Sequence, residues 1–209
     1  MDIKKCLLVL SMLALTGCSV GSYSYSREAM KRVDMNFVGI PTILGAGALG
    51  TSIPITPEYS LTAGHVARWT MHRVKAYHPY CDLAIIHHKN NLKKLPVFRT
   101  TKVGEPVRMY GYSFFSAMPV ESSGTNLAMT GIRNGWNKKP CVAMASNAGA
   151  VQGMSGGAVY HSDDSIGGVL VGYTSEVKNT ATQETKLKNV SLYIPYQVFQ
   201  TWLEVSTAS

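Results

Sequence analysis

The sequence contains no internal repeat and no low-complexity segment, and it shows little helical periodicity before its C-terminal end. Charged residues make up only 15% of the chain, and the 20 Lys and Arg residues are scattered rather than gathered in a stripe interleaved with aromatic residues. This distribution argues against nucleic-acid binding. The short β-rich runs, separated by Gly, Pro and Asn, instead predict an all-β chain, and a hydrophobic content of 45% can supply an ample core.

The histidines lack the spacing of a metal site. His87 and His88 are adjacent on an expected strand, so their side chains should point to opposite faces of the sheet. His72, His78 and His161 also lack the intervals typical of metal ligands. We therefore expect neither a metal nor a cofactor.

The N-terminus is typical of a segment that is removed after export. Two lysines in Met1–Lys5 precede an apolar run over Cys6–Leu15, which is too short to span a bilayer as a stable helix. We expect residues 1–17 to be a signal peptide. Residues 18–36 are polar and then basic, which predicts a linker or membrane tether.

Leu-Thr-Gly-Cys, ending at Cys18, resembles the bacterial lipobox, in which the cysteine after the cleavage site is lipidated. The alternative is an ordinary secretory signal followed by a chance cysteine. The resemblance implies a protein held in the bacterial cell envelope by its lipid. Ser19, rather than an aspartate, after the cysteine favours the outer membrane, with the protein facing the periplasm.

The stretch Gln-Gly-Met-Ser-Gly-Gly over residues 152–157 places Ser155 between glycines. Glycine permits backbone conformations in which successive N–H groups point at one spot. Such amides could bind the oxyanion that forms when a serine attacks a carbonyl group. Taken alone, however, a glycine-serine cluster is more often a simple turn.

Two further stretches supply the groups that a serine nucleophile needs. His65 ends the run Leu-Thr-Ala-Gly-His, and Asp82 begins the run Asp-Leu-Ala-Ile-Ile. An imidazole must take the proton of the serine, and a carboxylate must fix the tautomer of the imidazole and stabilise its cation. Asp82 is the only aspartate between His65 and Ser155. The sequence therefore predicts a triad of His65, Asp82 and Ser155.

These three motifs, in this order, resemble those of the trypsin/chymotrypsin-like serine proteases. Chain order excludes two other families that use the same triad. The α/β-hydrolases run Ser, acid, His, whereas the only histidine after Ser155 is His161, which leaves no room for an acid strand. A subtilisin order would need an aspartate before His65, and Asp34 has no strand motif around it.

The resemblance implies two six-stranded antiparallel β-barrels and a short C-terminal α-helix. We expect the first barrel over residues 37–99 and the second over 100–209. The boundary is placed near Thr100 because Val-Gly-Glu-Pro-Val, from residue 103, resembles the opening of the second barrel. The short interval from His65 to Asp82 predicts a trimmed first barrel. Apolar residues three and four apart after Pro195 predict the terminal helix.

The resemblance assigns a role to each member of the site. Ser155 would be the nucleophile, His65 the general base and acid, and Asp82 the group that orients the imidazole. The backbone N–H groups of Gly153 and Ser155 would bind the oxyanion. Met154 stands where many relatives carry an aspartate that pairs with a newly cleaved N-terminal amine, so we expect no activation of that kind.

The position that sets specificity in trypsin, six residues before the serine, is Gly149 here and is followed by Ala150. Tyr173 occupies the region of a later pocket wall. These residues predict a small or medium uncharged P1 residue rather than a basic one. Cys81 and Cys141 belong to regions that approach each other in the family, so they form either a disulfide or two buried thiols.

We therefore expect a monomeric serine endopeptidase that acts on protein or peptide substrates and is attached to a membrane by a lipid on Cys18. Two alternatives remain open at this point. One is a lipid-anchored binding protein that keeps the fold without proteolysis, and the other is an esterase that uses the same triad.

Overall fold

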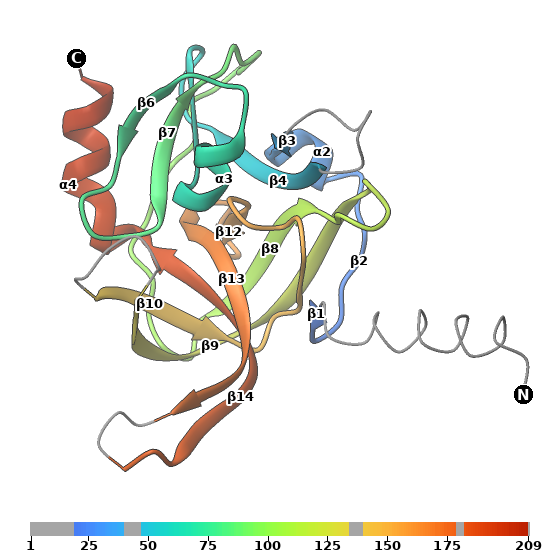
Figure 1. The fold of residues 1–209 in the computed structure, drawn as a ribbon, viewed down its shortest axis with the longest axis vertical. Coiled ribbons are helices and arrows are strands. Elements are labelled where there is room, and N and C mark those ends of the chain that lie inside the picture. Colours follow the sequence, from blue (N-terminus) through green and yellow to red (C-terminus); the bar gives the residue numbers. More distant parts are fainter. Residues whose placement is uncertain (1–18, 40–46, 134–139, 179–181, 209) are drawn as a thin grey trace, which may run out of the picture.

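The computed structural model describes residues 19–39, 47–133, 140–178 and 182–208 (Figure 1). The predicted signal peptide and Cys18 lie outside these residues. The chain folds mainly into antiparallel strands, as expected for an all-β protein. Within the described ranges, none of the helices is long and apolar enough to cross a bilayer. These helices are α2 (Ala29–Arg32), α3 (Gly64–Trp69) and α4 (Tyr196–Thr207).

The first sheet carries the His65 and Asp82 motifs. The described residues contribute five strands to it, in the order β3-β4-β5-β7-β6, rather than the six expected of a full barrel. Strand β7 lies between β5 and β6 and is buried along most of its length, which suits its continuous apolar sequence. The strands are β3 (Asp34–Gly39), β4 (Gly47–Pro54), β5 (Tyr59–Ala63), β6 (Val74–Tyr77) and β7 (Leu83–His87).

The second sheet closes on itself. Its strands follow the order β10-β14-β13-β12-β8-β9, and β9 pairs again with β10, so that six strands form a ring. The hairpin of β12 and β13 forms as predicted, with Ala158 opposite Val169. The strands are β8 (Pro106–Tyr112), β9 (Pro119–Ile132), β10 (Cys141–Ser146), β12 (Ala158–Tyr160), β13 (Ile166–Lys178) and β14 (Thr185–Pro195).

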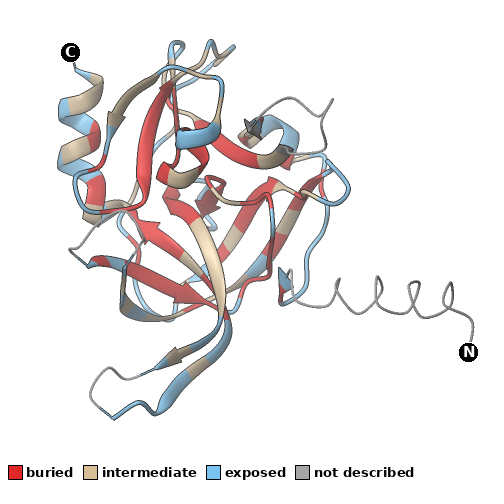
Figure 2. Cartoon of the chain, in the orientation of Figure 1, coloured by how far each residue is buried: buried red, intermediate tan, exposed pale blue. Residues whose placement is uncertain are grey.

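Buried side chains form a core that continues from one sheet into the other (Figure 2). Leu61 and Ile85 of the first sheet belong to the same apolar cluster as Val169 of the second. Phe199 of α4 is fully buried in this cluster, which confirms the predicted packing helix. The Trp202 ring of α4 also lies 5.1 Å from the ring of His78, in the turn that follows β6, measured between centroids. The helix therefore holds the two sheets together.

Residues 19–36, which belong to the segment expected to be a membrane tether or linker, are instead packed against the rest of the protein in the structure. Strand β1 (Ser19–Val20) pairs with β11 (Ala150–Val151), and β2 (Ser24–Tyr25) pairs with the start of β9. Farther along, Ala29 and Val33 are buried in the shared core. A polar composition is compatible with these short strands because backbone hydrogen bonds, which any residue can make, hold them in place.

Candidate active site

The pairing of β5 with β7 brings His65 and Asp82 together. Ala63, at the end of β5, lies opposite Leu83, at the start of β7, so both motifs emerge at the same end of the sheet. Asp82 Oδ2 is 2.6 Å from His65 Nδ1, and Asp82 Oδ1 accepts the backbone N–H of His65 at 2.8 Å. The carboxylate thus contacts both the ring and the main chain of the histidine.

This contact determines the tautomer of the His65 imidazole. An ionised carboxylate can only accept hydrogen bonds, so in the neutral form of the His65 ring the proton lies on Nδ1 and Nε2 keeps its lone pair. The Asp82 side chain is only 10% exposed, whereas that of His65 is 37% exposed. The imidazole therefore offers an accessible basic nitrogen backed by a shielded negative charge.

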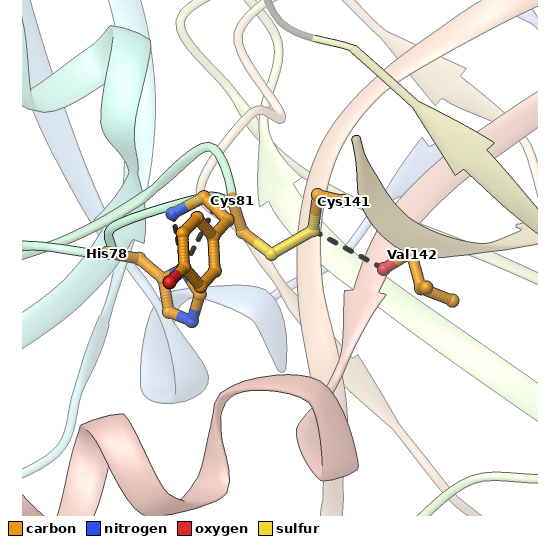
Figure 3. The surroundings of a disulfide bond; sticks show 5 residues. His78, Cys81, Cys141 and Val142 are labelled. Carbon is orange, nitrogen blue, oxygen red and sulfur yellow. Dashed lines mark hydrogen bonds between the residues drawn. A yellow bond between two sulfur atoms is a disulfide. The ribbon is translucent and has the colours of Figure 1, made fainter. Parts of the chain in front are cut away.

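The turn before Asp82 is held from two sides (Figure 3). Nδ1 of His78 accepts the backbone N–H groups of Cys81 at 2.9 Å and of Tyr80 at 3.2 Å. Cys81 also forms a disulfide with Cys141 at the start of β10, with the two Cα atoms 5.1 Å apart. Burial lowers the pKa of His78 below its ordinary value, which favours the neutral ring that can accept these hydrogen bonds.

The loop before Ser155 holds the Gly153 amide in a fixed direction. The carbonyl of Gln152 accepts the backbone N–H of Phe114 at 2.7 Å. In a planar trans peptide, a C=O group and the N–H of the next residue point in opposite directions. The Gly153 N–H is therefore turned away from Phe114. Gly153 has a φ of 101°, which L side chains rarely adopt, so the glycine is required here.

The Ser155 amide is fixed in the same manner. The Met154 carbonyl accepts the N–H of Gly157 at 2.8 Å, which turns the Ser155 N–H to the opposite side. The next amide, that of Gly156, donates to the Leu170 carbonyl at 2.7 Å. The peptide groups around the nucleophile are thus held individually by neighbouring backbone.

Two amides of this loop remain available for a ligand. Among the hydrogen bonds between described residues, none uses the N–H of Gly153 or of Ser155. Donors that are held in place without a partner are what an oxyanion site requires, because they need no reorganisation when charge develops.

The third contact of the predicted triad is not formed in this conformation. The Ser155 hydroxyl lies 3.5 Å from the carbonyl oxygen of Val171, and no hydrogen bond joins it to His65 in the described part of the chain. The two segments nevertheless meet. The Thr62 hydroxyl, three residues before His65, donates to the Thr51 carbonyl at 2.6 Å, and the Thr51 N–H donates to the Ser155 carbonyl at 2.8 Å.

The predicted specificity residues are packed against the N-terminal segment of the described chain. Ala150 is buried and pairs with Val20. Gly149 is packed so closely against the backbone of Ser22 that an added Cβ would lie 2.8 Å from the Ser22 nitrogen. Tyr173 is partly buried and packs against the apolar cluster that contains Val20 and Ala150. The N-terminal segment therefore packs against the residues that were predicted to set specificity.

Sequence reasoning missed several residues that shape this region. Thr51 and Phe114 contact the loop around Ser155 through hydrogen bonds, yet both occur in stretches without a recognisable motif. The pairing of β1 with the specificity loop also has no sequence signal, because two-residue strands carry no periodicity. Across the described ranges, no group of three His, Cys, Asp or Glu side chains is placed to hold a metal ion.

Comparison with known proteins gives a consistent result at the level of structure. No protein-family model matches the chain, and no curated protein matches its sequence. The active form of the Rv3671c protease from M. tuberculosis superposes with a TM-score of 0.63 at 16% identity, covering 83% of this chain and 79% of that one.

Two other proteases superpose about as well. The serine endoprotease from Yersinia pestis gives a TM-score of 0.60 at 18% identity, over 86% of this chain and 65% of that one. A serine-to-alanine variant of the HtrA-type protease AlgW, solved with a tripeptide, gives a TM-score of 0.60 at 18% identity. That match covers 84% of this chain and 61% of the AlgW chain. The chain thus has the two-barrel fold of the trypsin-like and HtrA-type serine proteases.

Proposed function

We propose that the protein is a serine endopeptidase that cleaves peptide bonds through His65, Asp82 and Ser155. The observation that carries the proposal is the double contact of Asp82 with the ring and the backbone of His65. A buried carboxylate that orients a half-exposed imidazole beside a loop with two unused amides is the arrangement that acyl transfer needs. The fold that the chain shares with solved proteases supports the same conclusion.

In the proposed reaction, Ser155 Oγ attacks the carbonyl carbon of the scissile bond while its proton passes to Nε2 of His65. The carbonyl oxygen becomes an oxyanion that accepts the N–H groups of Gly153 and Ser155. The intermediate then expels the amine, which takes the proton from His65, and leaves an acyl group on Ser155. Water repeats these steps to release the acid. Catalytic hydrogen bonds often tighten only in the substrate complex, and we assign the Ser155–His65 contact to that stage.

The proposed substrates carry a small or medium uncharged P1 residue. Gly149 and Ala150 supply no charge to pair with a lysine or arginine. The solved complexes of AlgW contain peptides, which makes an extended peptide the first substrate to test.

We further propose that the protein is attached to the envelope membrane by a lipid on Cys18. The lipobox-like sequence supports this, and the disulfide between Cys81 and Cys141 fits an oxidising compartment such as the periplasm. Because Ser19 already pairs with Val151, almost no free chain would separate the lipid from the specificity loop. The enzyme would then work close to the bilayer surface.

A fluorophosphonate probe tests the proposed catalysis directly. The wild type should be labelled, and Ser155→Ala should not be. Labelling together with cleavage of peptides supports the endopeptidase. Labelling with rapid hydrolysis of esters but not of peptides would identify an esterase. Absence of labelling in the folded wild type would favour a binding protein.

Metabolic labelling with an alkynyl fatty acid tests the anchor. We expect the wild type to incorporate the label and to partition into detergent, and Cys18→Ser to lose both properties. A wild type that is exported, unlabelled and soluble would show that the segment is an ordinary secretory signal.

A further inference from the structure

A single buried threonine on the first sheet connects that sheet to the catalytic loop. Thr51, on β4, has no exposed surface. Its hydroxyl donates to the Gly153 carbonyl at 2.8 Å and accepts the Tyr112 N–H at 3.0 Å. Its own N–H donates to the Ser155 carbonyl at 2.8 Å, and its carbonyl accepts the Thr62 hydroxyl at 2.6 Å. Every polar group of this residue is therefore engaged.

The hydroxyl of Thr51 acts on both sides of the Gly153 amide. On one side it holds the Gly153 carbonyl. On the other side it accepts the backbone N–H of Tyr112. Phe114 follows two residues later, and the N–H of Phe114 donates to the Gln152 carbonyl. Glycine has no Cβ to restrict rotation, so the direction of this amide depends on such external contacts.

We propose that Thr51 is a positioning residue for the oxyanion site, and that its hydroxyl sets the direction of the Gly153 N–H. The inference rests on the proposed protease function and adds a residue that does not touch the substrate. Removing the hydroxyl would leave the Gly153 carbonyl and the Tyr112 N–H without this partner in a buried site, and the loop would be free to turn. The loss should fall on the transition state, in which the oxyanion exists, and hardly on substrate binding.

The experiment compares Thr51→Val, which keeps the shape but removes the hydroxyl, with Thr51→Ser, which keeps the hydroxyl. We expect kcat of Thr51→Val to fall about 10- to 100-fold with KM within about twofold, below the roughly 10²–10³-fold cost of deleting an oxyanion donor. A peptide boronate, whose tetrahedral adduct places an oxygen in the same site, should bind more weakly by the same factor. Thr51→Ser should remain near the wild type.

Thr101→Val is the matched control. The Thr101 hydroxyl is also buried and bonds Asn126 and Tyr193, but it lies outside the catalytic loop. Melting temperatures are recorded for every variant, and Thr51→Ala replaces Thr51→Val if the latter does not fold. An equal fall of kcat in Thr101→Val, or a Thr51→Val enzyme with unchanged kcat and boronate affinity, would overturn the inference.

Hydrogen–deuterium exchange of residues 151–157 separates this inference from the proposed function. The amides of Met154 and Gly156 are bonded in the structure, and they should exchange faster in Thr51→Val but not in Thr51→Ser or Thr101→Val. A wild type that cleaves nothing would refute the protease function. In that case, exchange that is faster in Thr51→Val but not in the two other variants would still support the role of Thr51 in holding the loop. Unchanged exchange in Thr51→Val would refute that role.

Discussion

Reduction of the disulfide between Cys81 and Cys141 should destabilise the protein by a large and calculable amount. The two cysteines are 60 residues apart in the sequence. Closing a loop of that length removes about 14 cal/mol/K of entropy from the unfolded chain, which corresponds to about 4 kcal/mol at 25 °C. Single domains are typically stable by about 5–15 kcal/mol, so the bond would supply a substantial fraction of the total.

Other consequences of reduction should be small by comparison. Cys81 and Cys141 are only 4% and 5% exposed, and buried thiols behave as small apolar side chains, so reduction adds little desolvation cost. At about 2–4 °C per kcal/mol for a chain of this size, the melting temperature should fall by about 8–16 °C.

Urea unfolding of the protein, followed by tryptophan fluorescence with and without a reductant, measures this difference. The double variant Cys81→Ala, Cys141→Ala should resemble the reduced wild type and should not respond to the reductant. A free energy of unfolding that changes by less than about 1 kcal/mol on complete reduction would contradict the reasoning. It would mean that the unfolded chain already keeps these segments together, or that the bond strains the native state.

Three further predictions concern the triad, pH and the N-terminal strand. Asp82→Asn should lower kcat by about 10⁴-fold, because an amide can donate to Nδ1 and favour the wrong tautomer of His65. A loss below tenfold in steady-state assays would exclude Asp82 as the group that orients the imidazole. Burial lowers the pKa of His78, so the folded protein favours the neutral ring. The stability that this neutral ring contributes should be fully present above about pH 6.5 and should be lost as the pH falls toward the lowered pKa. His78→Gln should therefore flatten the pH dependence of the melting temperature, and an unchanged slope would refute this. Gly149→Ala should push its new methyl group against Ser22, and limited proteolysis should then cut the N-terminal segment faster than in the wild type.

Much of the fold could be predicted because local patterns and motifs agree. The apolar run after Asp82 became the buried strand β7, and the turn before Ile166 became the β12–β13 hairpin. The periodic segment after Pro195 became α4, which continues to Thr207. In each case a local pattern of side chains determines which face is buried.

The parts of the fold that the sequence does not predict depend on backbone contacts between distant segments. Residues 19–36 look like a tether because serine and tyrosine predominate, but their short strands are held by main-chain pairing with residues 120–121 and 150–151. Thr51 is an ordinary strand residue by sequence, and its importance comes from residues about 100 positions later. Composition and periodicity contain no information about such contacts.

The site lies where the two sheets meet, so its geometry depends on how firmly they are joined. The connections across this junction include the disulfide beside Asp82, the hydrogen bonds of Thr51 to the Ser155 loop, and the packing of Trp202 against His78. The disulfide holds the turn before Asp82, and Thr51 holds the carbonyl groups of Gly153 and Ser155. Backbone atoms and a few polar side chains make most of these contacts, and many sequences can supply them. This explains how a chain only 15–18% identical to solved proteases can still bring an imidazole, a carboxylate and a serine loop to one junction.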